Sequence, residues 1–220
     1  MLAHLTCSGG RGNSAFIYDA LGNQLSSTDA LGNTASYTYD SMGNVLTKTQ
    51  YLNPNTPLTW SYTYNSFQEV LTATDPLGNV TTNVYDANGN LLSTTTPPPS
   101  GSDSGLTTNF QYNSLGELTQ VTDPKGNTTH LAYTAAGLVA SITDAQSNTT
   151  TFTYDGRGNR LTSVDALNNT TSYTYDAMNR LTMITAPDLS TTQFAYDTRG
   201  RQRFRIRFRK GLREGCFRLF

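Results

Sequence analysis

The chain has 220 residues, of which 36% are hydrophobic and 14% are charged, and its formal net charge is −1. This is lean for a thick globular core, but 13 tyrosines and nine phenylalanines exclude the aromatic-poor composition of a disordered chain. There is no apolar run of about 18 residues, so no transmembrane helix is expected. The opening segment, residues 1–7, is too short for the hydrophobic region of a signal peptide.

The chain opens with a short segment and then becomes periodic. Residues 1–13 end in Arg11-Gly12-Asn13, which resembles the second half of a later turn, so we expect a partial repeat there. From residue 14 to residue 200 one phrase recurs, and most of its copies are 21 residues apart. A tyrosine anchors each copy: Tyr18, Tyr39, Tyr64, Tyr85, Tyr112, Tyr133, Tyr154, Tyr175 and Tyr196.

A second large side chain stands two residues before nearly every anchor. Residues two apart lie on the same face of a β-strand, so we expect these pairs to line one apolar face and to form the core. The partners are Phe16, Tyr37, Tyr62, Asn83, Phe110, Leu131, Phe152, Tyr173 and Phe194.

Two turn signals follow each anchor. The first begins with Asp, Asn or Thr directly after the tyrosine, and the second has the form Asp-x-x-Gly-Asn, as in residues 75–79 and 123–127. Asp and Asn bond their own backbone in turns, and Gly and Asn tolerate positive φ. The sequence therefore predicts tight turns at 155–159 and at 165–169, with a short strand between them.

Two intervals between anchors are longer, at 25 and 27 residues. Their extra residues form the segments 50–57 and 96–105, which are rich in proline and small polar residues. We expect both to be surface loops on one edge of the array.

The phrase predicts an all-β fold of tandem 21-residue, two-stranded repeats that form a curved antiparallel β-sheet ribbon. A single hairpin is marginal in water, so each repeat needs its neighbours for stability.

The pattern stops after residue 200. Residues 1–200 hold seven Lys or Arg and 15 acidic residues, roughly −8, whereas residues 201–220 hold eight basic residues and Glu214. We expect residues 201–220 to lie outside the fold. This basic tail could bind nucleic acid or an anionic membrane, begin a variable C-terminal module, or result from out-of-frame translation, which we favour.

Tyr-Asp, a Gly/Asn turn, a Leu/Thr run and Asp-Pro-x-Gly-Asn at a period of 21 residues resemble the YD repeat of RHS-repeat proteins. The resemblance covers about residues 14–200. This family includes bacterial polymorphic toxins, insecticidal toxin-complex shells and the animal teneurins. The resemblance implies a β-ribbon that spirals into a hollow shell, which in bacterial members encloses a variable C-terminal toxin or lies at the cell surface.

Family shells use more repeats than nine, and the closing motif with its self-cleavage aspartates is absent here. We therefore expect a fragment of a longer or truncated protein. Its expected partners are further RHS repeats or an enclosed C-terminal toxin, and its expected localisation is secreted or at the cell surface.

No motif in the chain predicts a reaction, so we expect no enzyme, no catalytic residue and no cofactor. The turn aspartates could bind calcium, but calcium needs six to eight converging oxygens, and turn chemistry explains them more simply. His4 and His130 lack a nearby nucleophile motif, and Cys7 and Cys216 are expected to be unpaired. Four Asn-x-Thr sequons also follow from the repeat, beginning at Asn79, Asn127, Asn148 and Asn169.

The function expected from the sequence is structural, as a wall segment of an RHS-type shell. An alternative is an extracellular module that binds carbohydrates or cells through the loops 50–57 and 96–105, with aromatic side chains stacking on sugars. A third is the carrier part of a polymorphic toxin whose effector lies outside this chain.

Overall fold

The structure, a computed structural model, describes residues 3–8, 13–51, 56–98 and 104–208. Every regular element in these residues is a β-strand, which confirms the predicted all-β class. No helix among them is long and apolar enough to cross a membrane. The chain divides into two units, Met1–Phe110 and Gln111–Phe220, which are described separately.

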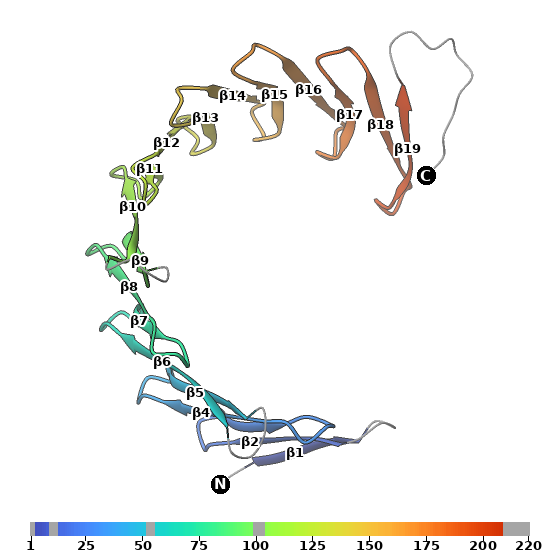
Figure 1. Ribbon diagram of the computed structural model, residues 1–220. Helices are drawn as coiled ribbons and strands as arrows, with labels where there is room; N and C mark the ends of the chain where they lie inside the picture. Colours follow the sequence, from blue (N-terminus) through green and yellow to red (C-terminus); the bar gives the residue numbers. More distant parts are fainter. Residues whose placement is uncertain (1–2, 9–12, 52–55, 99–103, 209–220) are drawn as a thin grey trace. The chain divides into compact units, whose positions relative to one another are not determined.

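The strands of the first unit follow one another in sequence order, and β10 ends two residues beyond it (Figure 1). They are β1 (Ala3–Ser8), β2 (Asn13–Tyr18), β3 (Gln24–Thr28), β4 (Thr34–Tyr39), β5 (Val45–Tyr51), β6 (Pro57–Tyr64), β7 (Val70–Thr74), β8 (Val80–Tyr85), β9 (Leu91–Thr96) and β10 (Leu106–Tyr112).

The second unit contains the remaining strands in the same arrangement. They are β11 (Leu118–Thr122), β12 (Thr128–Tyr133), β13 (Val139–Thr143), β14 (Thr149–Tyr154), β15 (Arg160–Val164), β16 (Thr170–Tyr175), β17 (Leu181–Thr185), β18 (Thr191–Tyr196) and β19 (Gln202–Phe208).

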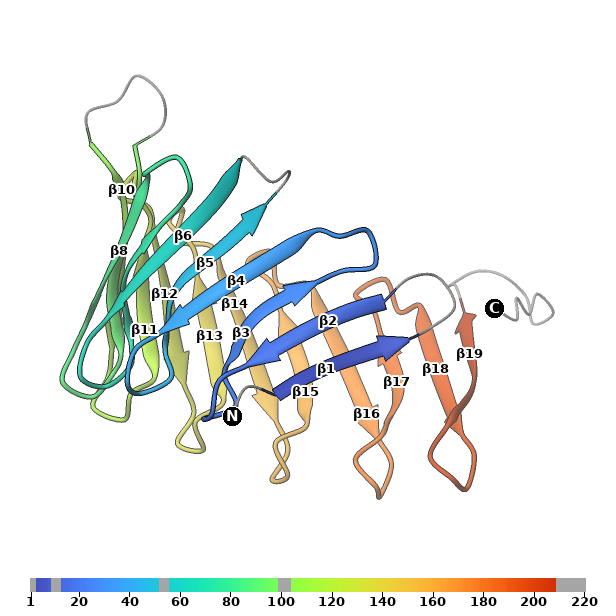
Figure 2. The ribbon, with the colours of Figure 1, turned by 90° about the horizontal axis from the view of Figure 1, so that it is seen from below.

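Within each unit, each strand pairs antiparallel with the next in the chain, and the layer curves (Figure 1). Figure 2 shows neighbouring strands of the first unit side by side, with successive connections at opposite edges. Each even-numbered strand ends at an anchor tyrosine. A register shift lies next to that tyrosine, as where Thr153 pairs with Thr162 but Tyr154 pairs with Arg160. The predicted tandem two-stranded repeat is therefore confirmed.

The alternation of side chains gives the layer two different faces. One, the aromatic face, carries the anchor tyrosines and the large residues two positions before them. The other, the threonine face, carries pairs of threonines whose hydroxyls hydrogen-bond across neighbouring strands. Examples are Thr38–Thr47, Thr49–Thr59, Thr63–Thr72, Thr95–Thr107, Thr143–Thr149 and Thr153–Thr162.

The expectation that the aromatic face forms a core is wrong for the described residues. None of their apolar side chains is buried, and the paired aromatic residues are only half-buried. The physical reason is that each unit is one layer, so only neighbouring side chains on the same face cover each ring.

The structure also differs from the expectation that residues 201–220 lie outside the fold. Residues 202–208 form β19, which pairs with β18 and repeats the register shift, since Ala195 pairs with Phe204 and Tyr196 pairs with Gln202. Strand pairing uses backbone groups, so the loss of the sequence phrase does not prevent one more strand from forming. Residues 209–220 lie outside the described residues.

Both long connections join an odd-numbered strand to the next even-numbered strand, β5 to β6 and β9 to β10. In an antiparallel meander such connections share one edge, as predicted for the loops 50–57 and 96–105. Residues 52–55 and 99–103 within them are outside the described residues.

Candidate functional site

The turn aspartates act on their own turns. In residues 155–159, Oδ1 of Asp155 accepts hydrogen bonds from the backbone N–H groups of Arg157 and Asn159, each at 2.9 Å. Its Oδ2 accepts a bond from Nδ2 of Asn159 at 2.8 Å. These bonds lower the pKa of the Asp155 carboxyl, and the Asn159 side chain is the largest cause. The carboxylate is therefore ionised and directed at the turn itself.

The same arrangement recurs through both units and on both edges. Oδ2 of the first-position Asp accepts a bond from the fifth-position Asn side chain at 2.7–2.9 Å, and the pKa of each such Asp is lowered in the same way. The aspartates are Asp19, Asp29, Asp40, Asp75, Asp86, Asp123, Asp144, Asp155 and Asp165. In the turns 176–180 and 197–201, arginine takes the place of the asparagine.

Each anchor tyrosine occupies one fixed place, the last residue of an even-numbered strand. The hydroxyl of Tyr154 donates to the carbonyl oxygen of Val139, on the neighbouring strand β13, at 2.8 Å. Val139 is the first residue of β13, where the register shift disrupts the ladder. The tyrosine therefore satisfies a backbone carbonyl that the neighbouring strand leaves available.

This bond recurs in seven repeats and spans 15 residues in six of them, and for Tyr64, which follows the longer loop 50–57, it spans 19. It joins the tyrosine to the first residue of the preceding strand for Tyr39, Tyr64, Tyr85, Tyr133, Tyr154, Tyr175 and Tyr196. In these seven repeats the anchor tyrosine therefore makes a defined hydrogen bond to the strand before it.

Cations lie over rings on the aromatic face in both units. The guanidinium carbon of Arg160 lies 5.5 Å from the ring centre of Phe152 and 4.9 Å from that of Tyr173. In the first unit, Nζ of Lys48 lies 5.4 Å from the Trp60 ring. Cation–π attraction stabilises both arrangements.

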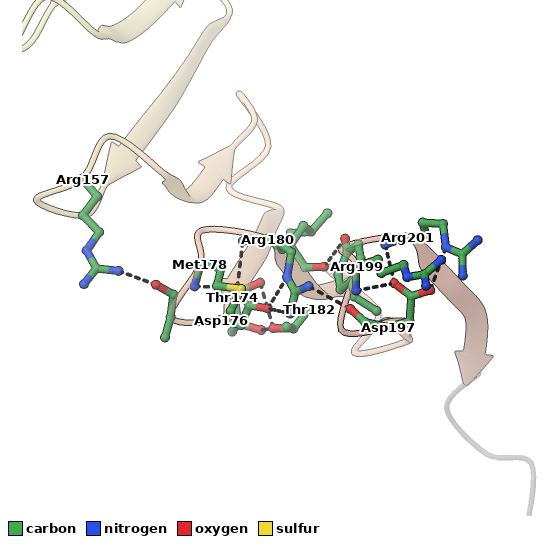
Figure 3. A network of polar contacts seen from close by, with 12 residues as sticks. Arg157, Thr174, Asp176, Met178, Arg180, Thr182, Asp197, Arg199 and Arg201 are labelled. Carbon is green, nitrogen blue, oxygen red and sulfur yellow. Dashed lines mark hydrogen bonds and ion pairs between the residues drawn. The ribbon is translucent and has the colours of Figure 1, made fainter.

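Arginines gather where three successive turns of the second unit lie on one edge of the sheet (Figure 3). We call this the arginine edge, made of Arg157, Arg180, Arg199 and Arg201 in the turns 155–159, 176–180 and 197–201. Arg157 donates to the carbonyl of Ala177 at 3.2 Å and to Oδ1 of Asn179 at 3.3 Å. This side chain therefore connects its turn to the next one.

The next arginine makes a similar connection. Arg180 forms an ion pair with Asp176 at 2.7 Å and donates to the carbonyl of Asp197 at 3.5 Å. Its guanidinium carbon also lies 4.7 Å from the Tyr196 ring centre. A shallow concavity of about 580 Å³ lies between the first two turns and is lined by Arg157, Asn179 and Tyr175, among others.

The other residues singled out from the sequence do not come together. His130 is exposed on β12, and the four sequon asparagines donate their side-chain amides to turn aspartates. His4 and Cys7 lie in β1, where their side chains are not described, and Cys216 is outside the described residues. In the described part of the chain, no three His, Cys, Asp or Glu side chains are grouped as metal ligands.

The arginine edge was not predicted. In the sequence, Arg157, Arg180 and Arg199 counted only toward a net charge, and Arg201 counted only as the start of the basic tail. Their positions carried a usable signal, because Arg157 and Arg199 share the third turn position and Arg180 and Arg201 share the fifth.

A family model described as RHS Repeat matches residues 18–57, 64–103, 85–128, 133–166 and 158–191, together well over half of the chain. The chain belongs to the RHS repeat family. No curated protein sequence matches it. The resemblance stated from the tyrosine phrase is therefore confirmed.

Solved structures show the same fold for this RHS-repeat chain. The crystal structure of TcdB2-TccC3-Cdc42 has 18% identity and a TM-score of 0.78, over 94% of this chain. The crystal structure of TcdB2-TccC3-TEV has 19% identity and a TM-score of 0.75, over 92%. A Photorhabdus luminescens Tc holotoxin pore with a mutation in TccC3 has 13% identity and a TM-score of 0.62, over 92%. The match spans only 12%, 12% and 15% of those chains, respectively.

Proposed function

We propose that this chain is a structural wall segment of an RHS-type shell in a secreted or cell-surface protein. The observation that carries the proposal is the single-layer sheet, whose described apolar residues include none that is buried. A sheet of this kind has little stability from burial of its own, so further repeats of a longer protein would complete it. The likeness to chains about eight times longer supports this.

On this proposal the segment has no reaction of its own. Its turn aspartates bind their own backbones and its tyrosine hydroxyls bind strand carbonyls, so these groups have structural roles. The partners would be further RHS repeats, and a C-terminal toxin or other effector would be enclosed by the completed shell.

The test is to express the longest reading frame that contains these repeats and to image the purified protein by cryo-electron microscopy. We expect a hollow particle whose wall contains residues 14–208 as one layer of paired strands. A solid particle, in which a second layer of the same protein packs on the aromatic face of this segment, would contradict the proposal.

A second candidate, a carbohydrate-binding module, is favoured by one feature of the first unit. A concavity of about 470 Å³ lies beside the loop 50–57 and is lined by Phe16, Gln50 and Tyr51, among others. An aromatic ring beside amide and hydroxyl groups suits a sugar. Binding on a glycan array that Tyr51→Ala abolishes, but that Tyr175→Ala leaves intact, would support this module. Binding that both variants retain would exclude this concavity.

A further inference from the structure

The arginine edge carries more positive charge than its turn geometry requires. Elsewhere the fifth turn position is filled by neutral or acidic residues, such as Asn23, Glu69 and Glu117. Asn23 donates its side-chain amide to Asp19 as Arg180 donates to Asp176, whereas Glu69 and Glu117 accept a bond from the asparagine at the first position of their turns. Turn formation therefore does not explain why arginines concentrate in three consecutive turns.

The nearby carboxylates only partly neutralise these arginines. Asp155, Asp176 and Asp197 each accept hydrogen bonds from their own turn. In the described part of the chain, Arg180 and Arg201 form ion pairs, whereas Arg157 and Arg199 form none. Arg157 donates its side-chain N–H groups to neutral oxygens, and Arg199 donates its backbone N–H to Asp197.

An exposed apolar side chain lies between these two arginines. Arg157, Met178 and Arg199 occupy the third position of consecutive turns, at the tips of one edge (Figure 3). Two strands separate consecutive tips, which places them about 10 Å apart. Met178 is 73% exposed, and Leu115 at the same position two turns before Arg157 is 81% exposed. None of the tips from Leu115 to Arg199 on this edge is acidic.

Cationic and apolar side chains that alternate along an exposed edge fit the boundary between lipid headgroups and acyl chains. Arginine binds phosphate with a bidentate fork, and an exposed methionine gains free energy on leaving water. A polyanion such as nucleic acid would use the arginines but leave Met178 in water.

We propose that the arginine edge binds the surface of an anionic lipid membrane, with Arg157 and Arg199 on headgroup phosphates and Met178 inserted between them. This contact is peripheral. It does not depend on the proposed shell function, because the edge lies within the second unit.

The test is co-sedimentation of the 220-residue chain with vesicles of phosphatidylcholine and phosphatidylglycerol in equal amounts. We expect binding that weakens with added salt and that vesicles of phosphatidylcholine alone do not show. The double variant R157Q/R199Q should bind up to roughly 30-fold more weakly, since each basic side chain near such a surface contributes to partitioning. The double variant K48Q/K125Q removes the same charge elsewhere and should bind like the parent.

A second pair of variants tests the apolar tip independently. Met178→Ser should weaken binding several-fold, whereas Leu167→Ser should not, although Leu167 is an 81% exposed third-position residue on the opposite edge. If circular dichroism shows that R157Q/R199Q does not fold, the pair Met178→Ser and Leu167→Ser still tests whether the arginine edge binds the membrane. Unchanged binding in both R157Q/R199Q and Met178→Ser would overturn the proposal. Binding to single-stranded RNA with no binding to vesicles would overturn it as well.

Discussion

The turns 155–159 and 186–190 have the same backbone and different side chains. In both, the first N–H donates to the fifth carbonyl at 2.9 Å, and the fourth N–H donates to the first carbonyl, at 3.1 Å and 2.9 Å. Turn 155–159 begins with Asp and has Gly at the fourth position, whereas turn 186–190 begins with Ala and has Leu there. Gly158 has φ of +84°, and Leu189 has φ of +65°.

Strand pairing therefore imposes the turn geometry, and the Asp and Gly residues adapt the chain to it. In turn 186–190 the left-handed conformation is adopted by Leu189, for which it is unfavourable because leucine has a Cβ atom. It also lacks the first-position carboxylate, and Ser190 donates its backbone N–H to Asp188 instead. The repeated phrase therefore stabilises a turn that its neighbours already define.

The largest expected difference between the two turns appears on acidification. The lowered pKa of the first-position aspartates means that they stabilise the fold above their ordinary pKa of about 4. This contribution is lost as pH falls through the lower folded value. We expect the melting temperature to fall below pH 4. The amide proton shifts of Arg157 and Asn159 should titrate with Asp155 in NMR spectra, and that of Leu189 should not follow the same curve. A melting temperature that stays constant down to pH 2 would contradict this.

Gly158→Ala should destabilise the protein by about 1 kcal/mol, because a Cβ atom is disfavoured at positive φ. The added Cβ would lie 3.7 Å from Leu138 Cδ1, an ordinary contact, so the cost comes from the backbone. Gly156→Ala is the matched control in the same turn, since no positive φ is found there and the space around it is open. Urea unfolding should show a loss for Gly158→Ala and no loss for Gly156→Ala. Equal effects would mean that the φ value does not determine the stability of this turn.

Leu189→Gly should have the opposite effect on stability and should stabilise the protein by roughly 0.5 kcal/mol. Relief of left-handed strain, about 1–2 kcal/mol, exceeds the extra chain entropy of glycine in the unfolded state. Leu189 is 61% exposed, so little apolar burial is lost. Urea midpoints measured beside those of Leu167→Gly, which removes another exposed leucine, would reveal any general effect of the substitution.

The smallest expected effect comes from Ala186→Asp, which gives the second turn the missing carboxylate. We expect a gain of about 0.5 kcal/mol or less from new hydrogen bonds at an exposed site. This gain should disappear on acidification, because the bonds require the ionised carboxylate. A gain that persists at pH 2 would indicate another cause.

The strands, the turns and the tyrosine positions could be predicted because each depends on contacts close in sequence. The phrase 152–176 contains both turns and the aromatic pairs Phe152/Tyr154 and Tyr173/Tyr175, and the structure has all of them. The partner of the tyrosine hydroxyl was not predicted. It is a backbone carbonyl 15 residues away, and side-chain periodicity contains no information about which carbonyl a register shift leaves available.

Two other predictions failed for reasons that can be stated. The aromatic face was expected to be a core, but spacing by two identifies a face and not what covers it. Residues 202–208 were expected outside the fold because their composition changes, but strand pairing does not require the repeat phrase. The arginine edge was missed because a charge total ignores turn position.

The bond from each tyrosine to the preceding strand has an evolutionary consequence. Tyr133, Tyr154, Tyr175 and Tyr196 each reach a carbonyl 15 residues earlier, and no such bond spans more than one 21-residue unit. Duplication or deletion of one unit in the gene would therefore restore every such bond on both sides of the junction. A ribbon built in this way can lengthen or shorten by recombination without passing through an unstable ancestor.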